Sequence, residues 1–223
     1  MDPSSLASRY LATRGKVCLL VLFVFLLWAA LYSAASSSES IPLFDGKSMG
    51  KWKITPLGGE GEVRIEEGQI ILAMGSDMTG ITWTGEFPRE NYEIQLEAMR
   101  RSGHDFFCGL TFPVGDNPCS LILGGWGGAV TGLSSIDGGD ASDNSTTKII
   151  SYQEGRWYRI RLRVTTQKIE AWLDQEKIVE QDLTGRRISI RPEVELSRPL
   201  GISTWRTEGA FRNLSYRILK GEK

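Results

Sequence analysis

The chain has 223 residues, with 26 Lys and Arg against 27 Asp and Glu and a formal net charge of −1. A domain that binds nucleic acid needs a basic surface to displace counterions from phosphates, so this balance argues against nucleic acid as a partner. Behind an apolar N-terminal segment about 180 residues remain, which suffices for one domain with a substantial core.

The first predicted element is a charge-free apolar run, VCLLVLFVFLLWAALYSAA, at residues 17–35. The run is long enough to cross a bilayer, and Arg9, Arg14 and Lys16 precede it, so the positive-inside rule places the remaining chain outside the cytoplasm. The small residues 33–35 also fit a signal-peptidase site. Residues 1–35 are therefore expected to be either a signal peptide or a single transmembrane anchor held in the membrane, and the protein is expected to be extracytoplasmic, secreted or membrane-anchored.

A Ser-rich linker is predicted at residues 36–41 and one domain at residues 42–223. Along this domain, short runs alternate apolar and polar residues and are separated by Gly, Pro, Asn or Asp, as is typical of half-buried antiparallel strands. Nine strands are predicted, at residues 62–65, 69–73, 92–99, 106–112, 120–123, 157–165, 168–173, 178–182 and 211–218.

Residues 66–68 and 174–177 each join two of these strands and predict hairpins. No long amphipathic helix follows the linker, and no internal repeat indicates a propeller. The pattern predicts an all-β fold, a two-sheet antiparallel jelly-roll sandwich of the concanavalin A or glucanase kind.

Two cysteines, Cys108 and Cys119, flank a turn-rich stretch at residues 113–118. An extracytoplasmic location favours a disulfide between them, whereas two buried free thiols are the alternative. The choice depends on strand register, which the sequence leaves open.

Six segments, taken in chain order, resemble one known family. They are residues 43–47 (LFDGK) with Trp52, then 65–70, 91–97, 155–160, 171–176 and 211–214. Together they resemble the 3-keto-disaccharide hydrolase domain family, which was long classified as a domain of unknown function.

The resemblance implies a concanavalin A-like jelly roll, secreted or tethered to a membrane, that acts on sugars oxidised at the 3-position. Such oxidation acidifies the neighbouring C2 proton, so that a base can remove it and expel the glycosidic oxygen before water adds. A divalent metal or a cationic side chain would stabilise the enolate. This chain departs from the family pattern at residues 107–110 and 119–126, which lack a strand-borne acid, and at residues 204–207, which lack a histidine.

His104, the only histidine, precedes Asp105, which could orient it or raise its pKa. Arg206 follows Trp205 just before the last predicted strand. We therefore expect His104, Asp105 and Arg206 as candidate catalytic residues. The alternative for His104 is a surface-loop histidine at the end of a strand.

Trp126 stands between two glycine pairs in the segment GGWGG. Trp126 and Trp205 are candidate sugar-binding residues, because tryptophan rings stack on the apolar faces of sugars. The alternative for Trp126 is a buried ring in a tight bulge.

Asp137, Asp140 and Asp143 lie three residues apart in a loop and predict a weak divalent-metal site, with a solvated turn as the alternative. Two glutamates, Glu193 and Glu195, are interleaved with arginines, a pattern that indicates ion pairs. The arginines concerned are Arg186, Arg187, Arg191, Arg198 and Arg206.

Three hypotheses result. The first is an extracytoplasmic carbohydrate-active hydrolase or lyase that cleaves 3-keto-glycosides. The alternative is a non-catalytic glycan-binding or adhesion module on the same fold, and a purely structural envelope protein is a third reading.

Overall fold

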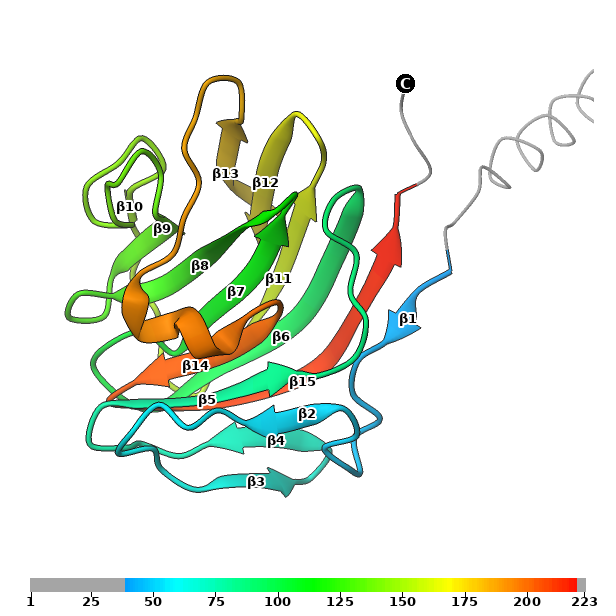
Figure 1. Ribbon diagram of the computed structural model, residues 1–223. Coiled ribbons are helices and arrows are strands. Elements are labelled where there is room, and N and C mark those ends of the chain that lie inside the picture. Colours follow the sequence, from blue (N-terminus) through cyan, green and yellow to red (C-terminus); the bar gives the residue numbers. More distant parts are fainter. Residues whose placement is uncertain (1–38, 220–223) are drawn as a thin grey trace, which may run out of the picture. The chain divides into compact units, whose positions relative to one another are not determined.

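The computed structural model describes residues 39–219, which form two antiparallel β-sheets and one short 3-10 helix (Figure 1). All strand pairs in this range are antiparallel. The predicted all-β, two-sheet sandwich is therefore confirmed.

The eight-stranded sheet contains the strands whose sequences alternate most clearly. Its order is β13 (Glu176–Asp182), β12 (Lys168–Leu173), β11 (Trp157–Val164), β6 (Tyr92–Gly103), β15 (Thr207–Ile218), β4 (Gln69–Leu72) and β3 (Val63–Glu66), with β1 (Ile41–Pro42) beside β15.

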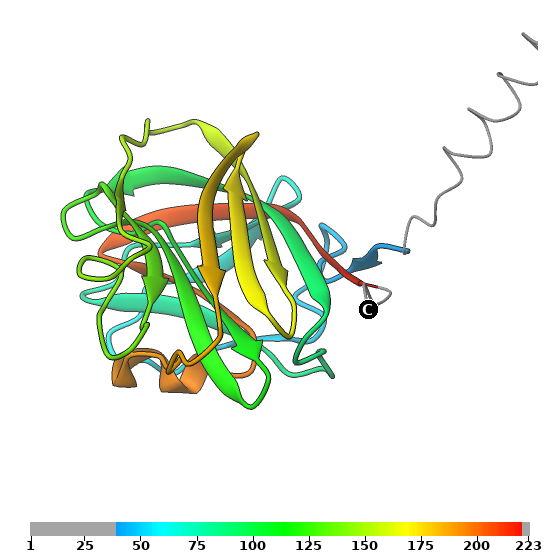
Figure 2. The same ribbon diagram turned by 90° about the horizontal axis from the view of Figure 1, so that it is seen from above.

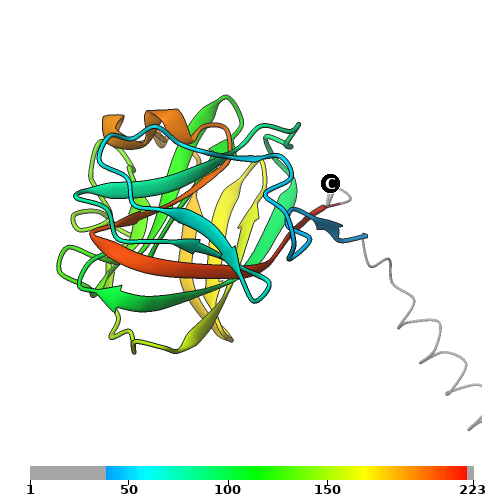
Figure 3. The same ribbon diagram turned by 90° about the horizontal axis from the view of Figure 1, so that it is seen from below.

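The seven-stranded sheet carries the candidate functional site. Its order is β10 (Lys148–Ile149), β9 (Val130–Ser134), β8 (Asn117–Gly125), β7 (Cys108–Val114), β14 (Gly201–Trp205), β5 (Met78–Trp83) and β2 (Trp52–Ile54). The 3-10 helix η1 (Pro192–Ser197) contacts β5 and β14. Figures 2 and 3 show its orange coil on the outside of the sandwich.

The core lies between the two sheets. On β11 the residues Tyr158, Ile160, Leu162 and Val164 are buried, as the alternating pattern predicts. Arginines 161 and 163 occupy the opposite face, where both pair with the buried carboxylate of Glu93.

The LFDGK segment forms a tight turn that fixes the N-terminal end of the domain to its core. The Asp45 carboxylate accepts hydrogen bonds from the backbone N–H groups of Lys47 and Ser48, each at 2.8 Å. Trp52 then packs in the core and donates its indole N–H to the Leu43 carbonyl at 2.9 Å. These contacts explain why the segment combines apolar residues with an aspartate and a glycine.

Cys108 and Cys119 are free and buried, so the disulfide alternative is wrong. They lie on neighbouring strands, but Cys108 is opposite Leu123 and Cys119 is opposite Phe112. Four residue steps therefore separate them along the strand direction. At about 3.3 Å per residue this is roughly 13 Å, beyond the reach of a disulfide.

The apolar run at residues 17–35 lies outside the described residues. Among residues 39–219 no helix has the length and apolar character needed to cross a membrane. The expected linker at residues 36–41 overlaps the first strand, since β1 begins at Ile41.

Candidate functional site

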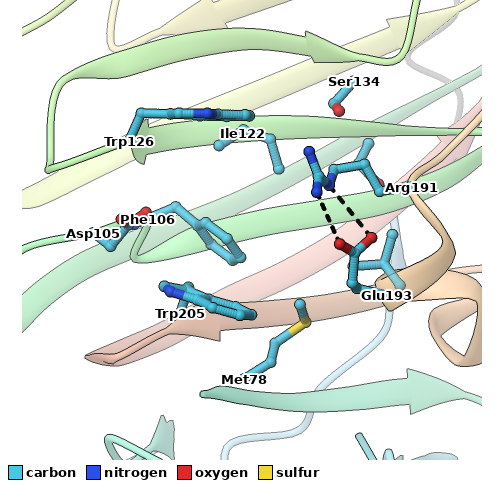
Figure 4. Close-up of a pocket in the computed structure, with 11 residues that line it drawn as sticks. Met78, Asp105, Phe106, Ile122, Trp126, Ser134, Arg191, Glu193 and Trp205 are labelled. Atoms are coloured by element: carbon cyan, nitrogen blue, oxygen red, sulfur yellow. Dashed lines mark hydrogen bonds and ion pairs between the residues drawn. The ribbon is translucent and has the colours of Figure 1, made fainter. Parts of the chain in front are cut away.

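A pocket of about 260 Å³ opens on the outer face of the seven-stranded sheet (Figure 4). Strands β8 and β9 supply Ser120, Ile122 and Ser134, whose side chains alternate with the core-facing residues of the same strands. Met78, at the start of β5, closes a further side.

Three aromatic rings line one end of this pocket. Phe106 and Trp205 are linked through the backbone, because the Trp205 N–H donates to the Phe106 carbonyl at 3.0 Å. Trp126 comes from the turn between β8 and β9 and has 45% of its surface exposed, so its ring is not buried in a bulge. In Figure 4 the rings of Trp126 and Trp205 lie on two sides of the cavity, with Phe106 between them.

A charged pair lines the other end. The Arg191 guanidinium is 2.8 Å from the Glu193 carboxylate and 2.5 Å from the Asp140 carboxylate. The hydrogen bond from Arg191 lowers the pKa of Glu193, and the bond to Glu193, helped by Asp140, raises the pKa of Arg191. Both groups are therefore charged at neutral pH.

The Asp105 carboxylate also lines the pocket and is held by backbone donors. It accepts hydrogen bonds from the N–H of Phe106 at 2.7 Å and from the N–H of Gly127 at 3.2 Å. The backbone N–H of Asp105 donates to the Thr207 hydroxyl at 3.0 Å. Asp105 thus ties the loop after β6 to the turn that carries Trp126.

Arg100, a buried residue at the end of β6, holds the same two segments from below. Its Nη2 atom donates to the carbonyls of Gly128 at 2.9 Å, Asp105 at 3.1 Å and Gly124 at 3.3 Å. A Cβ atom at Gly124 would lie 2.4 Å from this nitrogen. The glycines beside Trp126 therefore give the guanidinium access to the backbone carbonyls, while the tryptophan between them points outward.

The pocket brings together three of the five candidate catalytic and sugar-binding residues, namely Asp105, Trp126 and Trp205. His104 is exposed on the loop between β6 and β7 and does not line the pocket. Arg206 is also outside it. The Arg206 guanidinium pairs with Asp77 at 2.6 Å and donates to the Ser76 carbonyl, because its position after β14 turns it toward the loop before β5.

The three loop aspartates do not form a metal site in this structure. Asp137 pairs with Arg186 and accepts from the backbone N–H of Arg187, and both contacts lower its pKa. Asp140 pairs with Arg191, and Asp143 is exposed. Within the described range no group of three His, Cys, Asp or Glu side chains could hold a metal ion. The residues present do not fit a divalent cation, and the loop instead fastens the arginine-bearing segment to the sheet.

Arg191, Glu193, Phe106 and Met78 were not predicted as site residues. One local pattern was relevant to them, namely the interleaving of arginines with glutamates near residue 193. The ion pairs expected from it are confirmed, since Arg191 pairs with Glu193 and Arg198 pairs with Glu195. The position of these ion pairs beside the pocket depends on tertiary contacts, which a local sequence pattern does not predict.

The fold and the site define a β-sandwich domain with an aromatic, charged pocket on the outer face of one sheet. A family model described as the 3-keto-alpha-glucoside-1,2-lyase-like domain matches residues 39–217. The chain belongs to this family, which confirms the resemblance drawn from its six segments. No curated protein matches the chain.

Solved structures share the fold at low identity. A Bacillus subtilis protein of unknown function with a galectin-like fold has a TM-score of 0.58 and 10% identity, covering 82% of this chain and 96% of its own. The Bacillus subtilis carbohydrate-binding module CBM66 has a TM-score of 0.52 and 12% identity, covering 75% and 95%. A prokaryotic beta-1,3-1,4-glucanase from a mouse hindgut metagenome has a TM-score of 0.52 and 8% identity, covering 82% and 99%. These likenesses confirm the jelly-roll fold.

Proposed function

We propose that the domain recognises carbohydrate, and that a sugar binds between Trp126 and Trp205. The observation that carries this proposal is the pairing, in one pocket, of aromatic rings at one end with fixed charged groups at the other. Sugars present apolar C–H faces that stack on aromatic rings and hydroxyl groups that bond carboxylates and guanidinium groups.

Family membership supports a carbohydrate-related function. The proposal extends to the compartment in which the protein acts, because residues 1–35 carry the sequence pattern of a signal peptide or membrane anchor ahead of the predicted domain at residues 42–223. A secreted or membrane-anchored domain of this kind would meet its ligand outside the cytoplasm.

The first test measures binding of a glycan panel to the full chain by calorimetry. The panel contains mono- and oligosaccharides of glucose, galactose, mannose, fructose and xylose. Trp126→Ala and Trp205→Ala should each weaken binding at least tenfold, since each removes a stacking surface. Ile54→Ala, at an exposed apolar residue of β2 outside the pocket, is the matched control and should leave affinity unchanged. Equal affinity of the tryptophan variants and the parent would refute this site.

The second candidate function is cleavage of 3-keto-glycosides, favoured by family membership and by a carboxylate placed beside a guanidinium in the pocket. Glu193 would take the C2 proton, and the electron pair would pass through the enolate and expel the glycosidic oxygen from C1, which leaves a C1=C2 double bond. The expelled oxygen would take the proton from Glu193 and leave as an alcohol, and water would then add across the double bond. Arg191 would stabilise the negative enolate oxygen. The lowered pKa of Glu193 keeps it ionised but makes it a weaker base.

The same chain, incubated with 3-keto-disaccharides and with their unoxidised parents, tests this chemistry. Release of a monosaccharide from the keto sugars alone, lost in Glu193→Gln, is the expected result for an enzyme. Binding of the keto sugars without any product would leave the domain a glycan-binding module.

A further inference from the structure

We infer that the pocket receives the terminal unit of a saccharide chain and excludes the interior of a polysaccharide. The inference rests on the proposed function and concerns the shape of the sheet surface around the pocket. Saccharide sites on a sheet surface take two forms, an open trough that accepts many units in a row and a closed pocket that accepts an end.

A row of mostly small residues runs across the outer face of the seven-stranded sheet. Strand register places Gly80 opposite Ser203, Ser203 opposite Gly109, Gly109 opposite Ile122, and Ile122 opposite Gly132. Directly opposed residues point to the same side of a sheet, so this row forms the floor of a shallow depression across five strands. An uncovered row of this kind would be a trough long enough for several sugar units.

A loop covers the row at its β9 end. A Cβ atom at Gly132 would lie 3.1 Å from the Thr146 carbonyl and 3.2 Å from the Ala141 carbonyl. The loop is fixed by Asn144, whose amide donates to the carbonyls of Leu133 at 2.7 Å, Gly139 at 3.0 Å and Asp140 at 2.7 Å. Because the loop backbone lies directly on Gly132, no sugar unit can cross β9 at this point of the row.

Other segments cover the row toward β5. A Cβ atom at Gly80 would lie 2.9 Å from a methyl group of Leu57, and one at Gly109 would lie 3.0 Å from the Phe106 ring. Ser203 is buried. Next to it the helix η1 lies against β5, where the Thr82 hydroxyl donates a hydrogen bond to the Leu196 carbonyl at 3.0 Å. Only the part of the row at Ile122 therefore faces the cavity.

The cavity that remains is small. Its volume of about 260 Å³ lies below the roughly 300–1,000 Å³ of sites that hold drug-sized ligands. A single sugar unit between the tryptophans, with the next unit at the mouth, matches a cavity of this size.

The test uses the full chain and the linkage series that binds best in the glycan panel, at lengths of one to six units. Affinity should rise by no more than about threefold between two and six units, because later units lie outside the pocket. A 4,6-O-ethylidene group at the non-reducing end and reduction to the alditol at the other end each block one terminus. One of these two blocks should weaken binding at least tenfold and the other should not.

Affinity that climbs with each added unit to the hexamer, or binding that neither block affects, would overturn the terminal-unit inference while leaving the carbohydrate function in place. If the protein bound no saccharide in the panel, both the terminal-unit inference and the proposed carbohydrate function would be wrong. Loss of disaccharide affinity in Trp126→Ala would show that the observed binding occurs in this pocket.

Discussion

Arg100 is a buried cation that has no carboxylate partner among its hydrogen-bonding contacts in the described residues. Burial lowers its pKa, and backbone carbonyl dipoles take the place of a counter-ion. Its ring neighbours are Phe107 and Tyr152, with the guanidinium carbon 5.3 Å and 5.9 Å from their centroids. The conformation of the turn that carries Trp126 therefore depends on the close approach of the Arg100 side chain to the backbone carbonyls of this turn.

Alanine substitution of the turn glycines tests this dependence. Gly124 and Gly127 both have left-handed φ angles, of +76° and +87°, but only Gly124 has an atom of Arg100 in the space of a Cβ. Gly127→Ala should cost about 1 kcal/mol from backbone strain alone. Gly124→Ala should cost about 1–3 kcal/mol more, since displacing Arg100 leaves buried donors and carbonyls unpaired.

Urea unfolding of the two variants measures the difference, and saccharide affinity reports whether Trp126 has moved. Gly124→Ala should lose affinity while Gly127→Ala retains most of it. Equal stabilities for the two variants would mean that Arg100 adapts without cost and does not fix the turn.

At the level of strands, the sequence predicts the eight-stranded sheet well and the seven-stranded sheet poorly. Residues 168–173 are predicted with the observed bounds of β12, and the hairpin joining β12 and β13 is found. In contrast, β5 (MTGITW) and β9 (VTGLS) were not predicted, because nearly every residue in them is buried and each contains a glycine. Loops cover the outer face of this sheet, so the alternation that identifies a half-buried strand is absent.

The same covering loops limited what the sequence could say about the site. Trp126, Trp205 and Asp105 were identified because an aromatic residue among glycines and an acid at a strand end are visible locally. Arg191 and Glu193 reach the pocket through tertiary contacts such as the ion pair of Arg191 with Asp140, an interaction across 51 positions. The aspartates read as metal ligands are better explained as partners for Arg186 and Arg191.

At the scale of the whole molecule, the interior between the two sheets contains ionisable groups that stay neutral. Burial raises the pKa of Cys108 and of Cys119 from the ordinary 9.0 to about 12. Burial likewise raises the pKa of Tyr92 and of Tyr152. All four groups have a higher pKa in the folded chain than in water, so the free energy of unfolding depends on pH where these groups lose their protons.

This linkage predicts a loss of stability at alkaline pH. The unfolded thiols lose their protons near pH 9, whereas the folded thiols keep theirs until about pH 12, so the native state binds more protons in between. Their contribution is complete below pH 9 and is lost as pH rises toward 12. Each thiol adds a slope of at most about 1.4 kcal/mol per pH unit.

Urea unfolding from pH 8 to pH 10.5 would measure the slope. Cys119→Ala should unfold more easily at pH 8, because it leaves a cavity, but its stability should fall less steeply with pH than that of the parent chain. Leu121→Ala, two residues away on β8 and also fully buried, is the matched control: it creates a cavity without removing a proton. Its curve should run parallel to the parent curve at lower stability. If Cys119→Ala also ran parallel, the pKa of the thiol would be the same in the folded and the unfolded chain, and the sealed interior inferred from burial would be wrong.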